Sequence, residues 1–342
     1  MTSHVDDFVR VREGVCGEKR AKAPLRVAFE RKPTETHPES ADRALHGCVA
    51  VKPDPVEELG APYELTEDVA TAVNVALALG QPLLVTGEPG CGKTSLAYGV
   101  ALQLGQSRVW RFDTQSTTTS DELFYRFDHV RRFHDASVRE RDTLREAAAY
   151  VELQAFGAAL RSEDTEVILL DEVDKAPRDL PNDLLRRIEE PMRFQIREVT
   201  GEGTLEQKAR HLVIITSNHE RELPEPFLRR CAFVHLAFPE DPARLVKIVR
   251  RHLGGGGDDG LTEAAAARFL DVRKKLRENA AEGMARLPGT SELIAWTRTL
   301  RLLRKSPGEV RDAPLDARLG ASAVLKHWRE LPLFASPVTT SR

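Results

Sequence analysis

The chain reads Gly87-Glu88-Pro89-Gly90-Cys91-Gly92-Lys93-Thr94 between an apolar run at residues 82–86 and a helical pattern at residues 94–104. This stretch fits G-x-x-x-x-G-K-[ST] in its required context, after a strand and at the start of a helix. Glycines let the backbone wrap so that successive N–H groups face phosphate oxygens, and the new helix adds its positive N-terminal end. We therefore predict a nucleotide-binding loop formed by Gly87, Glu88, Pro89, Gly90, Cys91, Gly92, Lys93, Thr94 and Ser95.

Two further positions in the chain supply carboxylates beside such a loop. Lys93 can reach the β- and γ-phosphates, and the Thr94 hydroxyl can coordinate Mg²⁺. The apolar run at residues 167–170 leads directly into Asp171 and Glu172. We expect Asp171 to hold Mg²⁺ with Thr94, and Glu172 to polarise the attacking water. An acid next to the Mg²⁺ ligand favours hydrolysis over transfer to a metabolite.

Polar residues also follow the later apolar runs. The run at residues 212–216 is followed by Asn218, which would lie beside the γ-phosphate if this strand sits between those at 82–86 and 167–170. The other interpretation is a turn-forming asparagine. Arg229 and Arg230 precede the run at residues 233–236. They are either a surface charge pair or an arginine finger that neutralises transition-state charge at a neighbouring subunit's nucleotide.

Apolar runs and helical patterns alternate through the middle of the chain. The runs predict strands at residues 82–86, 108–112, 167–170, 212–216 and 233–236. Between them the spacing predicts helices at residues 65–79, 94–104, 138–160 and 183–190, and a β-hairpin within 194–212. This alternation indicates an α/β domain with a mainly parallel sheet. After Pro239 only helical patterns follow, at residues 241–253, 261–279, 291–303 and 316–330.

The chain thus divides into three expected parts. Residues 1–60 mix charges with prolines and show no sustained period, which favours an extended, partly disordered arm or linker over a small docking element. Residues 61–240 hold the nucleotide motifs and form the expected α/β core. Residues 241–342 form the expected all-helical domain.

Composition places the chain among cytoplasmic globular proteins and excludes several classes. Of 342 residues, 41% are hydrophobic and 30% charged, and 50 Lys+Arg against 53 Asp+Glu give a net charge of -3. This balance excludes the strongly basic footprint of a protein that coats nucleic acid, and few aromatic residues do not favour a stacking platform for single strands. The four cysteines form no C-x-x-C pair, and the chain shows neither a signal-peptide pattern nor a membrane-spanning apolar run.

The motifs together resemble the AAA+ ATPases, and within them the MoxR branch. Three stretches carry the resemblance: Gly87–Thr94, residues 169–185 around Asp171-Glu172-Val173-Asp174-Lys175-Ala176, and residues 215–231, which end Leu223-Pro224-Glu225-Pro226-Phe227-Leu228-Arg229-Arg230-Cys231. The resemblance implies a P-loop αβα sandwich with a parallel five-stranded sheet ordered 5-1-4-3-2, a helical lid, and a homo-oligomeric ring, expected to be a hexamer, with active sites between subunits. It makes Asn218 the sensor 1 residue and Arg230 the arginine finger, with Arg229 as a second candidate.

The chain departs from this family at the start of the lid's later helices. The family usually places a sensor 2 arginine shortly after a G-x-S, and here Glu292 and Leu293 occupy that region after Gly289-Thr290-Ser291. Arg298 lies about one and a half helical turns further on. The resemblance also places residues 117–125 in an insertion that faces the ring's pore, where Phe124 and Tyr125 either grip a substrate or belong to the core.

Three functions fit these features. The resemblance implies an Mg²⁺-dependent, ATP-hydrolysing ring that remodels or activates a partner protein, and family members often work with von Willebrand factor A proteins. The alternative is a motor subunit that acts on nucleic acid in a defence or restriction-type complex, with Arg126, Arg131 and Arg132 lining a basic pore. The third is a scaffold that binds ATP and seldom hydrolyses it, which the missing sensor 2 arginine favours. His211 and His219 show no metal-ligand spacing and are predicted to be structural.

Overall fold

The computed structural model describes residues 14–15, 45, 47–56, 63–138, 146–189, 191–199, 203–218, 220–253, 260–279, 287–326 and 328–334. The chain forms two compact units, Met1–Thr86 with Thr94–His235 and Gly87–Lys93 with Leu236–Arg342. The first unit contains the β-sheets. The second contains the C-terminal helices, and the glycine-rich loop Gly87–Lys93 groups with these helices.

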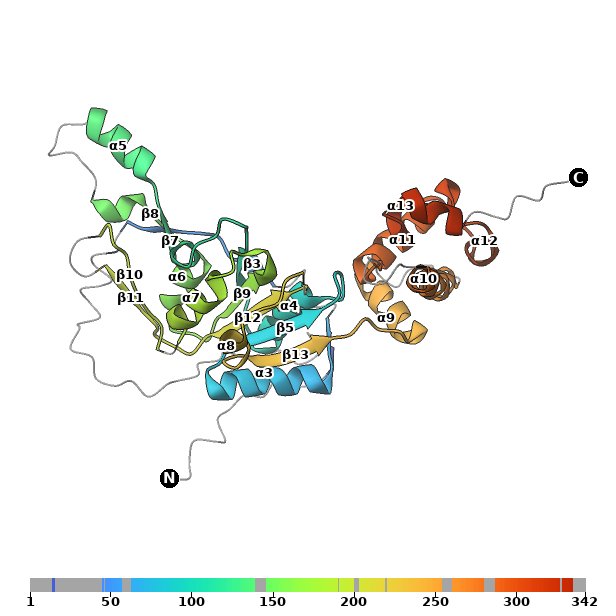
Figure 1. Ribbon diagram of the computed structural model, residues 1–342, viewed down its shortest axis with the longest axis horizontal. Coiled ribbons are helices and arrows are strands. Elements are labelled where there is room, and N and C mark those ends of the chain that lie inside the picture. The colour runs from blue at the N-terminus through green and yellow to red at the C-terminus, as the bar shows by residue number, and fades with distance from the viewer. Residues whose placement is uncertain are drawn as a thin grey trace, which may run out of the picture. The chain divides into compact units, whose positions relative to one another are not determined.

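A six-stranded sheet with the neighbour order β13-β5-β12-β9-β6-β3 is the centre of the first unit (Figure 1). Its strands are β5 (Leu83–Gly87), β6 (Arg108–Asp113), β9 (Val167–Asp171), β12 (Leu212–Ser217), β13 (Ala232–Leu236) and β3 (Asp54–Pro55). β12 pairs in parallel with both β5 and β9, and β9 pairs in parallel with β6. β5, β9 and β12 are buried over their whole length, which is why their sequences are almost continuously apolar. The predicted α/β class with a mainly parallel sheet is confirmed.

The sixth strand corrects the expected five-stranded parallel sheet. β3 pairs antiparallel with β6 and comes from the segment that the sequence assigns to an arm. Leu45 and Val56 are buried, and β2 (Val49–Ala50) pairs with a strand near residue 152. Residues 45 and 47–56, expected to belong to an arm or linker, therefore contribute buried side chains and short strands to the first unit. Such two-residue strands carry no alternation that a sequence pattern could reveal. Farther along the arm, β1 (Gly14–Val15) pairs with β4 (Glu64–Leu65), and the other arm residues lie outside the described part.

Helices pack around the main sheet. α3 (Glu67–Leu79), α4 (Lys93–Gln103) and α7 (Leu180–Arg187) lie close to the helices predicted at residues 65–79, 94–104 and 183–190, and two further short helices are α6 (Ala155–Leu160) and α8 (Glu225–Leu228). α3 ends where Gly80 adopts a left-handed conformation and donates its N–H to the Ala76 carbonyl, the ending that the glycine predicts. The predicted hairpin is present as β10 (Arg193–Gln195) and β11 (Thr204–Glu206), paired antiparallel.

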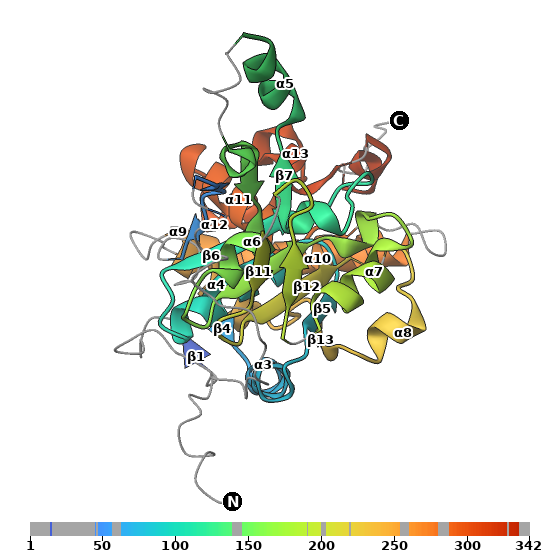
Figure 2. The same cartoon turned by 90° about the vertical axis from the view of Figure 1, so that its left-hand side faces the viewer.

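A smaller sheet carries a projecting helix. Its strand order is β2-β8-β7, with β7 (Tyr125–Phe127) and β8 (Val151–Leu153) antiparallel. α5 (His129–Val138) leads away from this sheet in both views (Figures 1 and 2). The predicted helix over residues 138–160 is wrong: α5 ends at Val138, and residues 147–160 form a 3-10 turn, β8 and α6. The short apolar run around Val151 is compatible with the helical period as well as with the strand period. It forms a strand because β8 pairs with β2 on one side and β7 on the other.

In its described residues, the helical unit packs three longer helices, two short ones and several turns around its own core. Its helices are α9 (Pro242–Leu253), α10 (Leu261–Glu278), α11 (Thr290–Leu302), α12 (Pro307–Asp312) and α13 (Ala321–Val324). Phe269 and Trp296 are fully buried, and the Trp296 indole N–H donates to the Leu319 carbonyl at 2.6 Å. The predicted helix over residues 316–330 is wrong, because the chain breaks at Gly320 (φ +67) into a 3-10 turn at Ala317–Leu319, α13 and a second 3-10 turn at Trp328–Leu333. Among the helices that the structure describes, none is long and apolar enough to cross a membrane.

Candidate functional site

The Asp171 carboxylate lies at the end of β9 in a shell of donors. The Thr94 hydroxyl donates to its two oxygens at 3.2 and 3.0 Å, and the Thr216 hydroxyl donates to Oδ1 at 2.5 Å. Arg111 Nη2 lies 3.1 Å from Oδ2. Because β9 and β12 are parallel neighbours, their carboxyl ends meet at one edge of the sheet and bring these groups together. The structure thus places the two predicted Mg²⁺ ligands, Thr94 and Asp171, in direct contact.

Thr216 and Arg111 are site residues that the sequence patterns did not single out. Thr216 is completely buried, and its hydroxyl also accepts the backbone N–H of Glu172 at 2.8 Å. Burial lowers the pKa of Arg111, but hydrogen bonds to Asp113 and Tyr98 and the charge of Asp171 raise it overall. Its guanidinium is therefore a permanent cation on the Asp171 side chain. In the sequence, Thr216 could have been recognised as a polar residue inside an apolar strand. No such feature in the sequence of β6 marks Arg111.

Glu172 has its backbone in the left-handed region, at φ 58. Left-handed backbone is uncommon for a residue with a side chain and is held here by the Thr216 bond. The Glu172 carboxylate accepts from the Asn218 amide at 3.1 Å and from Lys175. The Glu172 bond raises the pKa of Lys175. Asn218 and Glu172 therefore lie in direct contact, next to Asp171.

Asp174 fixes the segment that carries Asn218. Its Oδ2 accepts the backbone N–H groups of Asn218 at 3.1 Å and of Glu220 at 3.0 Å, and its side chain is buried. From the sequence, Asp174 was named only as a member of the stretch Asp171–Ala176, with no role of its own. Its two bonds tie the end of β12 to the turn that follows β9, and so set the distance between Glu172 and Asn218.

The loop Gly87–Lys93 forms its own hydrogen-bonded turn in the helical unit. Lys93 is 6% exposed, and its Nζ donates to the carbonyl oxygens of Gly87 and Glu88 at 2.9 Å each. Gly87 has φ 152, and a Cβ there would lie 2.4 Å from the Leu236 carbonyl oxygen, so a side chain cannot be accommodated. Burial raises the pKa of the Cys91 thiol, which keeps it protonated near neutral pH.

Two helices of the same unit hold this loop. The Thr290 N–H donates to the Gly90 carbonyl at 3.0 Å, and the Thr290 hydroxyl donates to the same oxygen. Arg273 Nη2 lies 2.6 Å from Glu88 Oε2. Glu292, near the expected sensor 2 position, accepts the Gly289 N–H at 3.0 Å and caps α11, while Leu293 is buried in the core and Arg298 is exposed. The start of α11 therefore presents no arginine.

The two arginine-finger candidates lie on the surface after α8. Arg229 donates to Glu225 Oε1 at 3.1 Å, one helical turn earlier, and Arg230 is exposed. Phe124 and Tyr125 are buried, and the Phe124 ring stacks on Phe194 with 4.3 Å between centroids. These two aromatic residues thus belong to the core, the second of the two predicted interpretations. His211 is buried, and burial lowers its pKa to about 4, while His219 lies outside the described residues.

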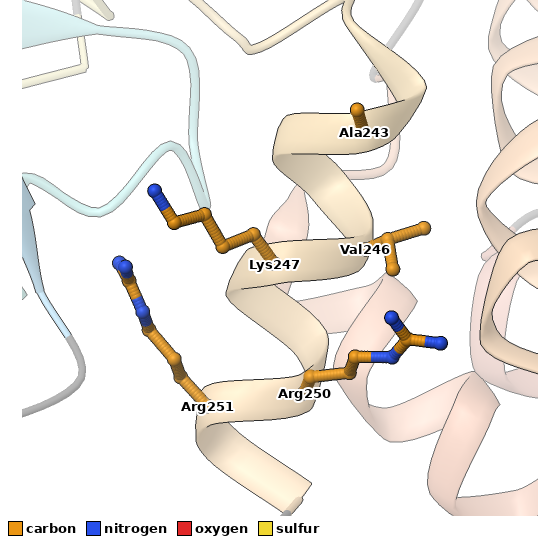
Figure 3. Close-up of a pocket in the computed structure, with 5 residues that line it drawn as sticks. All are labelled: Ala243, Val246, Lys247, Arg250 and Arg251. Atoms are coloured by element: carbon orange, nitrogen blue, oxygen red, sulfur yellow. The ribbon is translucent and has the colours of Figure 1, made fainter. Parts of the chain in front are cut away.

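A hollow of about 490 Å³ lies along α9 and is lined by Ala243, Val246, Lys247, Arg250 and Arg251 (Figure 3). Arg250 extends away from Lys247 and Arg251 and pairs with Glu263 at 2.5 Å. None of these residues belongs to the nucleotide motifs. Among the described residues no group of three or more His, Cys, Asp or Glu side chains is arranged to hold a metal ion. One carboxylate and one hydroxyl, as at Asp171 and Thr94, are nevertheless a typical protein share of a Mg²⁺–nucleotide site.

One part of the chain is similar to a known protein family. Residues 82–231 match the family of AAA domains, in its dynein-related subfamily. This part of the chain is thus similar to an AAA domain, over less than half of the 342 residues. The matched residues include the glycine-rich loop, Asp171, Glu172, Asn218 and both finger candidates. The C-terminal helices lie outside the match.

The chain also matches solved structures. The chain is similar to the Holliday junction branch migration motor RuvB of Thermotoga maritima, with 16% identity and a TM-score of 0.36 over 75% of this chain and 80% of that one. No curated protein sequence matches the chain.

Proposed function

We propose that this protein binds ATP with Mg²⁺ and hydrolyses it, and that it works as a MoxR-like ring that remodels or activates a partner protein. The observation that carries the catalytic part is the contact of Thr94, Asp171, Glu172 and Asn218 at one edge of the sheet. In the chain, the loop Gly87–Lys93 joins the end of β5 to Thr94, so the phosphate-binding segment and the metal ligands are adjacent in sequence.

Each residue has a role that follows from its chemistry. Lys93 would bind the β- and γ-phosphates, and the backbone N–H groups of Gly90–Thr94 would bind the remaining phosphate oxygens. Mg²⁺ held by Thr94 and Asp171 would neutralise phosphate charge. Glu172 would orient the attacking water and draw off its proton, with Asn218 fixing both the carboxylate and the water. Asn218 already holds Glu172 at 3.1 Å, which supports this pairing.

The ring assembly is proposed from the sequence resemblance. The choice of arginine finger rests on the resemblance and on the exposure of the arginine side chains. Arg230 is exposed and Arg229 is tied to Glu225, which favours Arg230 as the residue that reaches a neighbouring subunit. Residues 61–240 would form the core of each subunit, residues 241–342 the lid, and residues 1–60 an arm or linker whose residues 49–50 and 54–55 pair with the core. The MoxR-like motifs around Lys175 and Leu223-Pro224 support a protein client, including one with a von Willebrand factor A domain.

Two measurements test this function. Wild-type protein should release phosphate from MgATP, and Lys93→Ala should abolish nucleotide binding. Arg230→Ala should lower turnover by roughly 10³-fold. Mixing Arg230→Ala subunits with Lys93→Ala subunits should restore activity, because an intact loop then meets an intact finger. If the mixture stays as inactive as its components, Arg230 does not act between subunits.

A second candidate function, a motor on nucleic acid, is favoured by the projecting helix α5. Arg131 and Arg132 lie on it, with Arg126 on β7 before it. Arg132 already stacks over the Phe127 ring at 5.5 Å, and Arg131 over Tyr150 at 6.0 Å. DNA affinity that falls steeply with salt would support this function, and absence of binding at low salt would exclude it.

A further inference from the structure

Arg273 is a buried cation in the helical unit. Its side chain is 3% exposed and its guanidinium has three contacts: Glu88 Oε2 at 2.6 Å, the Pro288 carbonyl, and the face of the Phe238 ring at 3.6 Å. Burying a guanidinium is costly unless a carboxylate and hydrogen-bond acceptors compensate for the lost water. The carboxylate that does so here belongs to the nucleotide-binding loop.

Glu88 connects this cation to the lysine of the loop. Its side chain binds Arg273, and its backbone carbonyl accepts Lys93 Nζ at 2.9 Å. Lys93 has three donors and uses two of them on the carbonyls of Gly87 and Glu88. To bind oxygens of two phosphates it must release at least one of these carbonyls. Phosphate binding by Lys93 therefore breaks a hydrogen bond to the carbonyl of Glu88, which Arg273 holds, or to that of its neighbour Gly87.

The loop lies in close backbone contact with the start of α11. A Cβ on Gly289 would lie 2.6 Å from the Pro89 carbonyl oxygen and 2.8 Å from Gly90 Cα, so the two backbones are in van der Waals contact. Thr290 adds two hydrogen bonds to the Gly90 carbonyl. A shift of the loop at Glu88–Gly90 is thus felt at the beginning of α11 and, through Arg273, in the middle of α10.

We propose that the Glu88–Arg273 pair is the contact through which the helical unit responds to nucleotide, in a chain whose α11 starts without an arginine. Arg273 is a positioning residue: it acts through Glu88 and Lys93 and does not touch the nucleotide. This inference rests on the proposed function, since it requires a nucleotide on the loop. By thermodynamic linkage, if bound nucleotide stabilises the helices, the helices strengthen nucleotide binding by the same free energy. Arg273 therefore also raises nucleotide affinity.

The first test is amide hydrogen exchange in the full chain, with and without saturating MgADP. Nucleotide should slow exchange in α10 (Leu261–Glu278) by about fivefold or more in the wild type. At a MgADP concentration that saturates the variant, Glu88→Gln should lose this effect, because its side chain no longer carries the charge that pairs with Arg273. The matched control is Glu263→Gln. Glu263 lies on α10, like Arg273, and pairs with Arg250 of α9, so this variant should retain the slowing of exchange by nucleotide. Wild type that binds MgADP without a change in α10, or Glu88→Gln that responds like the wild type, overturns the inference; wild type that binds no nucleotide overturns the proposed function itself.

A double-mutant cycle covers the possibility that Arg273 only supports the fold. Arg273→Met leaves the Glu88 charge uncompensated beside the phosphate-binding backbone, so the Kd for a fluorescent ADP should rise by about fivefold or more. In the Glu88→Gln background the same substitution should change Kd less than about twofold, because no unpaired carboxylate remains. Equal effects in both backgrounds, or a loss of stability with no change in Kd, would show that the pair does not couple helices to nucleotide.

Discussion

Replacing Thr216 by valine removes one hydroxyl from the centre of the site and leaves the shape of the side chain almost unchanged. That hydroxyl donates to Asp171 Oδ1 at 2.5 Å and accepts the Glu172 N–H at 2.8 Å, and it is completely buried. An unsatisfied buried group costs about 1–3 kcal/mol. Asp171 keeps Thr94 and Arg111 as partners, so the cost falls mainly on the Glu172 N–H, and the free energy of unfolding should fall by about 1–3 kcal/mol.

The effect on turnover should be larger than the effect on stability alone explains. Without the Thr216 bond, the Glu172 N–H loses the acceptor that helps to hold its left-handed backbone, so the carboxylate is less firmly placed beside Asn218. We expect ATP turnover to fall by about tenfold or more with little change in ATP binding, because misplacing a catalytic group by about 1 Å is that costly. Urea unfolding and steady-state phosphate release measure the two effects.

Thr86→Val is the matched control for this experiment. Thr86 lies on the neighbouring strand β5, is buried to 1% exposure, and hydrogen bonds through its hydroxyl to His235 Nδ1 at 3.0 Å. The same substitution there should lower stability and leave turnover within about twofold. If both variants lose stability equally and keep equal turnover, Thr216 does not position Glu172 and the reasoning is refuted.

Three further outcomes follow from individual residues. Gly289→Ala should lower both the Tm and nucleotide affinity because its Cβ would meet the Pro89 carbonyl at 2.6 Å, whereas Gly308→Ala, with open space around it, should raise Tm slightly as expected for a glycine inside a helix; scanning calorimetry and titration with ADP compare them. His211, whose pKa burial lowers to about 4, binds protons only in the unfolded chain between pH 6.5 and pH 4, so stability should fall with decreasing pH by about 2 kcal/mol between pH 8 and pH 5, and urea unfolding of His211→Gln should show a correspondingly shallower decline. Cys91 should react with iodoacetamide at pH 7.5 more slowly than a free thiol, since burial raises its pKa, and bound nucleotide should slow it further; rapid labelling that nucleotide does not affect would contradict the placement of Cys91 in the loop.

The residues of the proposed site are predicted from local patterns in the sequence. The glycine pattern specifies backbone conformation directly, and the acids after residue 170 follow a strand whose burial is visible in its composition, so these patterns single out Lys93, Thr94, Asp171 and Glu172. Asn218 was predicted on the condition that its strand lies between those at residues 82–86 and 167–170, and β12 does lie between β5 and β9.

Other features depend on contacts between distant segments that no local pattern encodes. β3 and β8 are short strands whose form is decided by the partners they pair with, and the long helix predicted over residues 138–160 fails for that reason. Arg111 and Arg273 look like ordinary surface arginines in the sequence. Only the fold reveals that one lies 3.1 Å from Asp171 and the other 2.6 Å from Glu88.

Glu172→Gln tests the central claim most directly. The substitution keeps the size of the side chain and its ability to accept from Asn218, but removes the charge that would orient and deprotonate water. Binding of ATP and release of phosphate should be measured on the same preparation. The account predicts that ATP binds with an affinity close to that of the wild type while turnover falls by about 10²-fold or more. Turnover equal to that of the wild type would contradict the assignment of Glu172, and with it the catalytic site described at this edge of the sheet.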